Sequence, residues 1–418
     1  DIDGESAYDE SGYSVSLSGD GNTVAIGAPN NNENGSYAGN VRIYENIGGS
    51  WSQIGQDIDG EAAGDNSGSS VSISDDGNIV AIGAPWNDGN GTDAGHVRIY
   101  ENIGGSWSQI GQDIDGEAAG DNSGYSVSLS SDGNTVAIGA PNSDGNGSNS
   151  GHVRIFQNVG GSWSQIGNDI DGESANDWSG HSLSLSFNGN TLAIGAHGND
   201  NNGNSSGHVR IFENIGGSWL QIGNDIEGES NNDQSGWSVS VSSDGNTVAI
   251  GAISNSNNGN NFAGTVRIYK NIGGSWSKIG QNLDGEATGD NSGRSVSLSA
   301  DGLTVAIGAQ YNDVNGNYGT NEGDVRVYNY NGTFWSQIAQ DIEGEAAYDD
   351  SGYSVSLSAN GNTVAIGSHL NDGNGSNSGH VRVYNLLSLT NAGGCDSVHT
   401  LNLTINYSTS STDTQVAC

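Results

Sequence analysis

The chain repeats one unit of about 56 residues seven times. The motif Asp-Ile/Leu-Asp/Glu-Gly-Glu, with Asn replacing the first Asp in one copy, opens each unit, and the units begin at residues 1, 57, 113, 169, 225, 282 and 341. Periods of this length are typical of propellers and solenoids, in which one unit buries its apolar face only against its neighbours. Seven copies therefore indicate one closed or stacked array rather than the two or three domains that 418 residues suggest.

Four short strands can be recognised in the third copy. The first alternates apolar and polar side chains, as a strand with two different faces does, and the Asp-Gly pair that follows it favours a tight hairpin. The four strands are expected at residues 123–130, 135–140, 153–156 and 163–166. Helical periodicity is absent, and the 69 glycines disfavour helices. The sequence therefore predicts an all-β fold, a seven-bladed β-propeller of four-stranded antiparallel blades over residues 1–385.

The seventh copy is incomplete. In the other six copies a Trp marks the fourth strand, at Trp51, Trp107, Trp163, Trp219, Trp276 and Trp335. The missing strand is expected either before residue 1 or in the tail, for instance at residues 398–405. The tail, residues 386–418, contains both cysteines and much Ser, Thr and Asn. We expect it to form a strand and linker segment, the start of a further module in a longer polypeptide.

The charge of the chain excludes two classes of partner. Acidic residues outnumber basic ones 49 to 10, and the formal net charge is -39. A field of this sign repels nucleic acid and anionic lipid. No apolar run approaches the roughly 18 residues that a membrane span needs. We therefore expect no nucleic-acid partner and no direct membrane insertion.

The repeat resembles the FG-GAP repeat of integrin-α-type β-propellers. The segment GYSVSLSSDGNTVAIGAP at residues 124–141, followed by GHVRIF, carries the resemblance, which extends over residues 1–385. A Gly-Ala-Pro signature stands at residues 27–29, 83–85 and 139–141, whereas Ser-Gly replaces the Phe-Gly element. The sequence of the repeats is similar to that of repeats in large secreted surface proteins of Bacteroidetes. The tail is similar to Ig-like modules of adhesins in that group. The resemblance implies an extracellular, non-enzymatic adhesin module, exported by the type IX system and used in attachment or gliding.

The family's calcium loop is not carried over to this chain. Integrin-type blades hold calcium in a DxDxDG loop between the first two strands. In the third copy that connection is the short turn 131–134, which is too small to surround an ion with six or more oxygen atoms.

A second loop gives a calcium hypothesis of its own. Between strands two and three, a D-x-N-x-S spacing resembles the start of a loop with oxygen ligands. The candidate ligands are Asp88, Asn90, Asp144, Asn146, Asp200, Asn202, Asp313, Asn315, Asp372 and Asn374. One carboxylate per loop predicts weak binding, at about 10⁻⁴–10⁻³ M. The alternative is ordinary turn chemistry, which the same residues supply.

Acidic residues also recur in the connection between blades. A Glu at position 5 and an Asp at position 9 stand in all seven copies, and the candidates include Glu61, Asp65, Glu117, Asp121, Glu173 and Asp177. They are either metal ligands or structural acids. In the structural alternative, the Glu pairs with the Arg of strand three and the Asp accepts backbone N–H groups. Strand parity places this connection and the loop between strands two and three on one face of the ring.

Four aromatic residues break the repeat on this predicted acidic face. They are Trp86, Trp178, Trp237 and Tyr311. They either bind a ligand, by stacking on sugar rings or anchoring a protein, or fill gaps between blades. Catalysis has little support, because His96, His152, His208 and His380 occupy one repeated position instead of one asymmetric site.

Three functions are therefore compatible with the sequence. The first is a non-enzymatic adhesin module that presents its acidic loop face to a glycan or protein. The second is a structural, calcium-stabilised spacer of a fibre or stalk. The third, which the sequence favours least, is a carbohydrate-active hydrolase or lyase. The irregular aromatic residues favour binding over a purely structural role.

Overall fold

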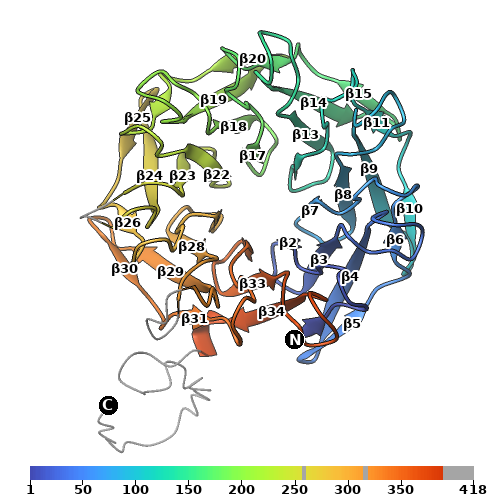
Figure 1. Ribbon diagram of the computed structural model, residues 1–418. Coiled ribbons are helices and arrows are strands. Elements are labelled where there is room, and N and C mark those ends of the chain that lie inside the picture. Colours follow the sequence, from blue (N-terminus) through green and yellow to red (C-terminus); the bar gives the residue numbers. More distant parts are fainter. Residues whose placement is uncertain (257–259, 314–318, 389–418) are drawn as a thin grey trace, which may run out of the picture.

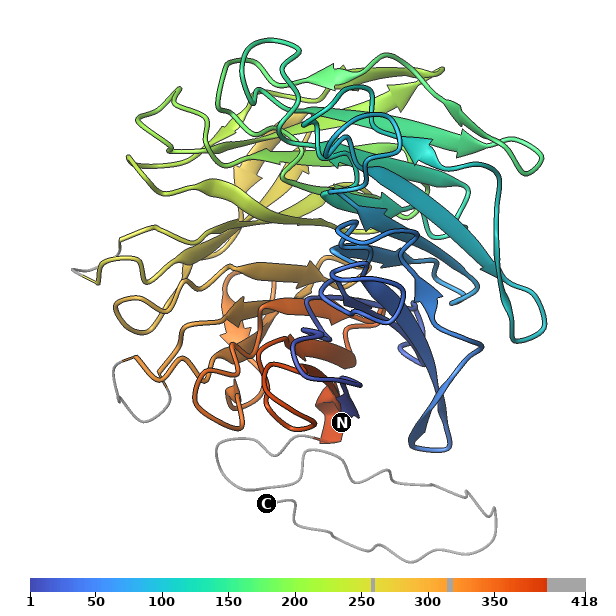
Figure 2. The same cartoon turned by 45° about the vertical axis from the view of Figure 1, so that its right-hand side comes forward.

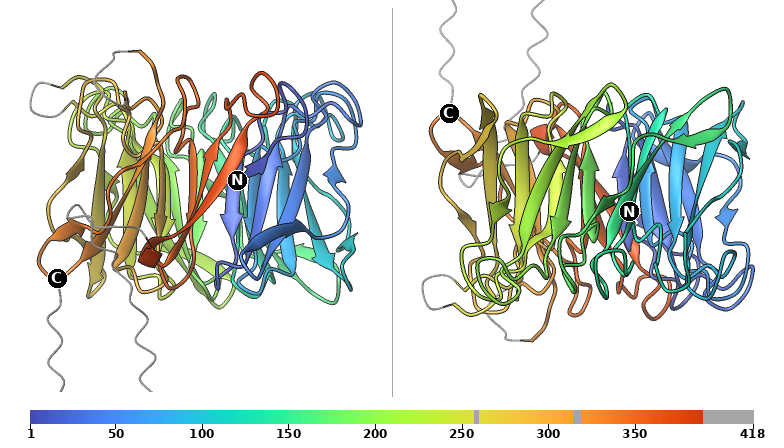
Figure 3. Two further views of the ribbon diagram at one scale, coloured as in Figure 1. Left: turned by 90° about the horizontal axis from the view of Figure 1, so that it is seen from below. Right: turned by 90° about the horizontal axis from the view of Figure 1, so that it is seen from above.

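Seven antiparallel sheets surround a common axis in the computed structural model, which describes residues 1–256, 260–313 and 319–388 (Figure 1). The strands run between two faces of a disc (Figure 3). Within the described residues the helical content is one short 3-10 turn, η2 (Leu386–Ser388). The predicted all-β, seven-bladed propeller is confirmed. Among the same residues, no helix is long and apolar enough to cross a bilayer.

Each blade places its strands in chain order from the axis outward. The first strands are β2 (Ser14–Leu17), β7 (Ser70–Ile73), β12 (Ser126–Leu129), β17 (Ser182–Leu185), β22 (Ser235–Val241), β27 (Ser295–Leu298) and β32 (Ser354–Leu357). The second strands are β3 (Thr23–Ala28), β8 (Ile79–Ala84), β13 (Thr135–Ala140), β18 (Thr191–Ala196), β23 (Thr247–Ala252), β28 (Thr304–Ala309) and β33 (Thr363–Ser368). The third strands are β4 (Asn40–Ile47), β9 (His96–Asn102), β14 (His152–Asn158), β19 (His208–Ile215), β24 (Thr265–Ile272), β29 (Asp324–Tyr330) and β34 (His380–Asn385).

The outer strand of a blade consists of two pieces that pair with the same third strand. The pieces that begin at or beside the repeated Trp are β5 (Ser50–Gln53), β10 (Trp107–Gln109), β15 (Trp163–Gln165), β20 (Ser218–Gln221), β25 (Ser275–Lys278) and β30 (Trp335–Gln337). The second pieces are β6 (Ile58–Asp59), β11 (Ile114–Asp115), β16 (Ile170–Asp171), β21 (Ile226–Glu227), β26 (Leu283–Asp284) and β31 (Ile342–Glu343). The motif that opens each sequence repeat forms the last strand piece of the preceding blade. Its buried Ile pairs with the third strand, so the motif ends one blade before the next begins.

The N-terminus closes the ring. Strand β1 (Ile2–Asp3) pairs antiparallel with β34, and Ile2 lies opposite Val381. Residues at the start of the chain thus supply the second outer piece of blade 7. Of the two expected sources, the tail segment 398–405 lies outside the described residues. Among the described residues, blade 7 has no counterpart of the Trp-bearing piece.

The hydrophobic core lies between blades rather than within one sheet. Seven apolar clusters fill the seven interfaces, and the one that contains Ile2 joins blade 7 to blade 1. The second strand, Thr-Val-Ala-Ile-Gly-Ala in most copies, is buried on both sides and packs against both neighbours. Its Gly is required by this contact, because a Cβ at Gly139 would overlap the carbonyl oxygen of Gly180 in the next blade.

Circles of hydrogen bonds surround the axis. In one, the hairpin backbone of each blade donates to the next, from Gly19 N to the carbonyl of Asp75 and onward through seven blades, with N···O distances of 2.8–3.3 Å. In a second, a first-strand hydroxyl accepts from the following blade, as when Ser16 Oγ accepts from Ile73 N at 3.1 Å. In a third, another first-strand serine donates to a carbonyl of the next blade. The serines of the first strand are therefore ring-closing residues.

The two faces of the disc differ in chemistry. One face, here called the loop face, carries the loops between strands two and three together with the connections between blades. Backbone bonds such as Gly64 N to Ser36 O (2.9 Å) join these two kinds of loop. Loops project from both faces of the disc (Figures 2 and 3). The opposite face, the hairpin face, carries the Asp-Gly turns that join strands one and two, such as the turn between β12 and β13. This arrangement confirms the prediction from strand parity.

Candidate functional site

One residue of each blade stands at the loop-face end of the first strand, at position 13 of the repeat. We call these residues the channel ring: Tyr13, Ser69, Tyr125, His181, Trp237, Arg294 and Tyr353. Six of the seven carry a large aromatic or basic side chain. Because the first strands are the innermost strands, these side chains meet around the axis.

The channel ring forms a continuous arc over six blades. Tyr125 and His181 lie with ring centroids 5.0 Å apart, and His181 and Trp237 with centroids 4.7 Å apart. The guanidinium carbon of Arg294 lies 5.4 Å from the centroid of Trp237 and 4.0 Å from that of Tyr353. The Tyr353 ring then contacts that of Tyr13, at 4.9 Å. The arc is open only at blade 2, where the residue is Ser69.

A second variable position supports the arc from behind. Position 29, directly after the second strand, is Pro in three copies and His197, Ile253, Gln310 or His369 in the others. His197 stacks on Trp178 with an interplanar angle of 10° and contacts His181 at 4.3 Å between centroids. His369 lies 4.0 Å from Tyr353, and Gln310 Oε1 accepts a 3.0 Å bond from Arg294 Nε.

Burial keeps the imidazoles of this cluster neutral. It lowers the pKa of His197 to about 4 and that of His369 to about 3, in the latter case with the help of the Arg294 charge. Burial also lowers the pKa of His181 well below its usual value, and the neighbouring His197 and Arg294 add to this effect. The fixed positive charge of the cluster is therefore that of Arg294. Within this cluster, four buried nitrogen atoms have no hydrogen-bond partner among the described residues: His181 Nδ1, His197 Nδ1, His369 Nδ1 and Trp237 Nε1.

The structure places two of the four predicted ligand-binding residues in this cluster. Trp237 belongs to the channel ring, and Trp178 is its stacking support through His197. Trp86 and Tyr311 occupy position 30, one residue beyond the supporting position, and are 42% and 38% exposed. Tyr125, at 37%, is the most exposed aromatic residue of the ring itself. Trp86, Tyr311 and Tyr125 are therefore the accessible aromatic rings of this set.

The loop residues predicted to bind calcium make hydrogen bonds within the protein. Asp144 Oδ1 accepts from Asn149 N at 2.9 Å, and Asn146 Nδ2 donates to the Gly172 carbonyl at 2.8 Å. The equivalent bonds recur at Asp88, Asn90, Asp200, Asn202, Asp372 and Asn374. Asp313 accepts from three backbone N–H groups, and Asn315 lies outside the described residues. These Asn side chains act as donors, so calcium binding here stays a prediction without geometric support.

The acids of the blade connection divide into two kinds. The Asp of position 9 is buried and accepts from the loop, as Asp65 Oδ2 does from Ala62 N at 3.0 Å and from Asn87 Nδ2 at 3.1 Å. Asp121 and Asp177 accept the equivalent backbone bonds. The Glu of position 5 stays half exposed. The predicted pairing of this Glu with the Arg of strand three is present as an ion pair in all seven copies, with an N···O distance of 2.9 Å in copy 5 and 3.6–3.9 Å in the others.

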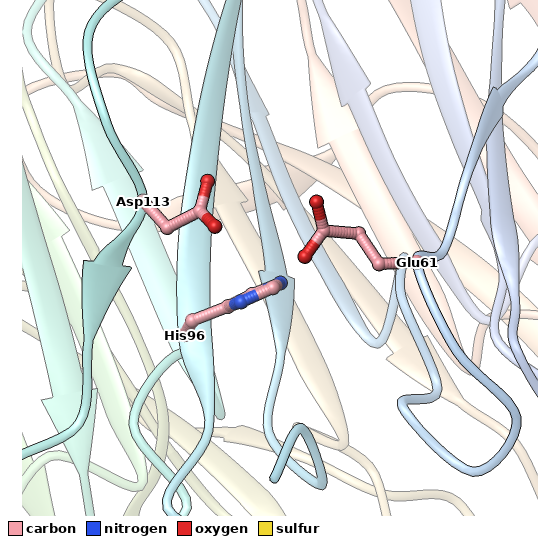
Figure 4. Close-up of side chains that lie close together, drawn as sticks. All are labelled: Glu61, His96 and Asp113. Carbon is pink, nitrogen blue, oxygen red and sulfur yellow. The ribbon is translucent and has the colours of Figure 1, made fainter. Parts of the chain in front are cut away.

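Three of these Glu residues join a His and an Asp at blade interfaces. The groups are Glu61–His96–Asp113, Glu117–His152–Asp169 and Glu173–His208–Asp225, and in each the ligand atoms lie within 4.8 Å of one another. In the first group the three side chains point toward a common space (Figure 4). Its Glu comes from the connection after blade 1, whereas its His and Asp belong to blade 2. The structure thus gathers clusters that could hold a metal, although not in the loops where calcium was predicted.

The family's calcium loop does not fit this chain. In the hairpin of copy three, Asp132 accepts from Asn134 N at 3.0 Å and from the Ser130 hydroxyl at 2.6 Å. The turn is closed by its own hydrogen bonds, and Asp132 is its one carboxylate. This geometry agrees with the conclusion from sequence that the loop is too short.

Sequence reasoning missed most of the channel ring. It found Trp237 as an irregular aromatic residue, but not Tyr13, Tyr125, His181, Arg294 or Tyr353. The signal was present in the comparison of copies: position 13 changes nearly every time, between a nearly invariant Ser-Gly and a nearly invariant Ser-Val-Ser.

The fold and the ring of repeats define a seven-bladed β-propeller with an irregular channel mouth. Four segments of the chain match the FG-GAP repeat family: residues 3–44, 58–100, 114–156 and 338–384. Together with the seven blades, these matches support an FG-GAP propeller. No curated protein matches the chain.

Proposed function

We propose that the chain is a non-catalytic extracellular adhesin module and that it binds a carbohydrate at the loop-face mouth of its channel. The channel ring carries this proposal. In a chain that otherwise repeats itself closely, position 13 carries five different residue types in seven copies, and these residues meet around the axis. A purely structural ring would be expected to keep one residue at this position, as it does for the neighbouring serines.

The chemistry of the mouth suits a sugar. Aromatic faces such as that of Tyr125 can pack against the C–H face of a pyranose, and indole and phenol groups bind well where one end is apolar and the other wet. Arg294 adds the hydrogen-bond donors of a planar guanidinium group. The exposed rings of Trp86 and Tyr311 widen the aromatic surface beyond the channel ring.

The extracellular assignment has separate support. FG-GAP repeats are typical of extracellular proteins and generally occur in non-enzymatic propellers. The net charge of -39 disfavours nucleic acid and anionic membranes as partners. Attachment, with other modules of a longer polypeptide as neighbours, is consistent with both observations.

One observation favours a second function, that of a stiff spacer. The three circles of hydrogen bonds and the closure by β1 make the ring rigid without any ligand. A spacer would need these features and no irregular mouth. The two functions therefore differ in whether the channel ring matters.

Glycan-array binding by the wild type and two channel-ring variants tests the proposal. Tyr125→Ser and Trp237→Ser introduce the residue that copy 2 carries at the same position, and Phe334→Ser removes a 51% exposed ring from the hairpin face as the control. We expect the channel-ring variants to lose at least about tenfold in affinity, or about 1.4 kcal/mol, while the control binds normally. Equal binding by all four proteins would contradict the proposed site. An array without hits would contradict the carbohydrate and leave a protein ligand or the spacer function.

A further inference from the structure

We propose that each of the three Glu–His–Asp groups binds Zn²⁺ or a similar transition-metal ion and thereby joins two neighbouring blades. The sites lie at the interfaces of blades 1 and 2, 2 and 3, and 3 and 4, and each ion would be held by one imidazole nitrogen and two carboxylates. This inference is independent of the proposed carbohydrate site, which lies at the channel mouth.

The three imidazoles are buried, and among the described residues that of His208 is fully unsatisfied. His208 is fully buried, neither of its ring nitrogens has a hydrogen-bond partner, and its Nδ1 lies 3.9 Å from Asp225 Oδ2. His152 is also buried, and its Nε2 has no partner. A buried polar atom without a partner is costly, and a metal ion at this position would satisfy the Nδ1 that faces the acids.

The carboxylates are positioned for a cation. Asp113 accepts a 2.6 Å bond from Gln109 Nε2 through Oδ1, which leaves Oδ2 available, and the same Gln–Asp bond recurs in the other two groups. Such outer hydrogen bonds orient the ligands of metal sites. The Glu is half exposed in each group and can move toward an ion, since 4.8 Å between ligand atoms is wider than a coordinated ion requires.

Copy 5 provides a natural comparison. There the His is Thr265 and the Asp is Asn282, and Glu229 turns to Arg267 instead, with a 2.9 Å ion pair. In copies 2 to 4 the corresponding Arg and Glu atoms are 3.7–3.9 Å apart, and the Arg donates instead to a backbone carbonyl of the preceding blade. The Glu thus approaches the Arg closely in copy 5, whereas copies 1, 6 and 7, which among the described residues lack a complete Glu–His–Asp group, keep Arg–Glu distances of 3.6–3.8 Å.

The ligand set selects the class of metal. Calcium takes oxygen ligands, whereas imidazole with carboxylates suits Zn²⁺ and its neighbours in the first transition row. Three protein ligands on a partly exposed site leave a coordination position for water.

Zinc stoichiometry of the full chain tests this proposal. Cys395 and Cys418 are alkylated first, so that thiolates do not contribute, and bound Zn²⁺ is counted by equilibrium dialysis at pH 7. In copy 7, Glu345 lies close to His380, but no third metal-binding side chain among the described residues completes the group. We therefore expect three Zn²⁺ per chain, undisplaced by millimolar Ca²⁺. Co²⁺ in the same sites should give visible absorption bands.

Matched variants locate the ions. His96→Asn, His152→Asn and His208→Asn introduce the residue of copy 1, Asn40, and should each remove one Zn²⁺, with none left in the triple variant. Thr265→Asn, the control at the same position, should keep three. Thr265→His combined with Asn282→Asp and Lys278→Gln should create a fourth. An unchanged count in a folded triple variant, no zinc on the wild type, or displacement by Ca²⁺ would overturn the proposal.

Discussion

Arg294 lies between two aromatic rings of neighbouring blades, with its guanidinium carbon 4.0 Å from the centroid of Tyr353 and 5.4 Å from that of Trp237. The three residues come from three different copies of the repeat and occupy the same position in each. This contact links blades 5, 6 and 7 at the channel mouth, and it makes an arginine the centre of an otherwise aromatic arc.

We expect Arg294→Gln to destabilise the protein by about 1–2 kcal/mol, because two cation–π contacts and the bond to Gln310 are lost. Urea unfolding followed by fluorescence measures this change. Lys270→Gln removes a positive charge from an exposed position of β24 and is the matched control. Equal stability losses in the two variants would show that net charge, rather than the contacts of Arg294, decides the outcome.

Gly139→Ala should destabilise the chain by about 3 kcal/mol or more, because its new methyl group would overlap the Gly180 carbonyl at the blade interface. The comparison is Gly145→Ala, where the nearest atom to the new Cβ is a carboxylate oxygen of Asp171 at 3.2 Å. Thermal unfolding of the two variants measures the difference. Similar melting temperatures of the two variants would contradict the close contact between blades at Gly139.

Asp324→Asn should make stability less dependent on pH. Burial raises the pKa of Asp324 to about 8, against the opposing effect of Arg326, and both carboxylate oxygens lack hydrogen-bond partners. The native state thus binds this proton more tightly than the unfolded chain does. The stability that the proton provides is present below about pH 4 and is lost as the pH rises to about 8.

The melting temperature of the variant relative to wild type should therefore be lowest near pH 4 and rise until about pH 8. Asn is tolerated at this position, because copy 1 carries Asn40 there. A difference that does not vary with pH would contradict the raised pKa.

The blades were predictable from sequence because their causes are local. Alternating Val and Ser in the first strand, Asp-Gly turns and the apolar second strand each specify structure within a few residues, and the repeat confirms them seven times. The split outer strand was not predicted, because Ile58 and its equivalents stand in a segment whose acids and glycine favour a loop. The segment forms a strand because its isoleucine fills an apolar pocket between two blades.

The sites were predictable only in part, because their residues are distant in sequence. Tyr13 and Tyr353 contact each other only once the ring has closed. The three Glu–His–Asp groups were not predicted either. The sequence analysis gave Glu61 and His96 different roles, and it gave no role to Asp113, which stands at the start of the next repeat. Periodicity shows which residues are repeated, and the three-dimensional ring shows which repeats meet.

The most direct test of the carbohydrate site uses the nine tryptophans as internal reporters. With 5-fluorotryptophan in the chain, ¹⁹F NMR resolves Trp86, Trp178 and Trp237 on the loop face from the six outer-strand tryptophans, after assignment by single Trp→Phe variants. On titration with a glycan found on the array, we predict that the Trp237 resonance shifts with saturation and that those of Trp178 and Trp86 shift with it. The six outer resonances should stay in place. Shifts confined to the outer tryptophans, or binding without any change at Trp237, would contradict the channel mouth as the binding site.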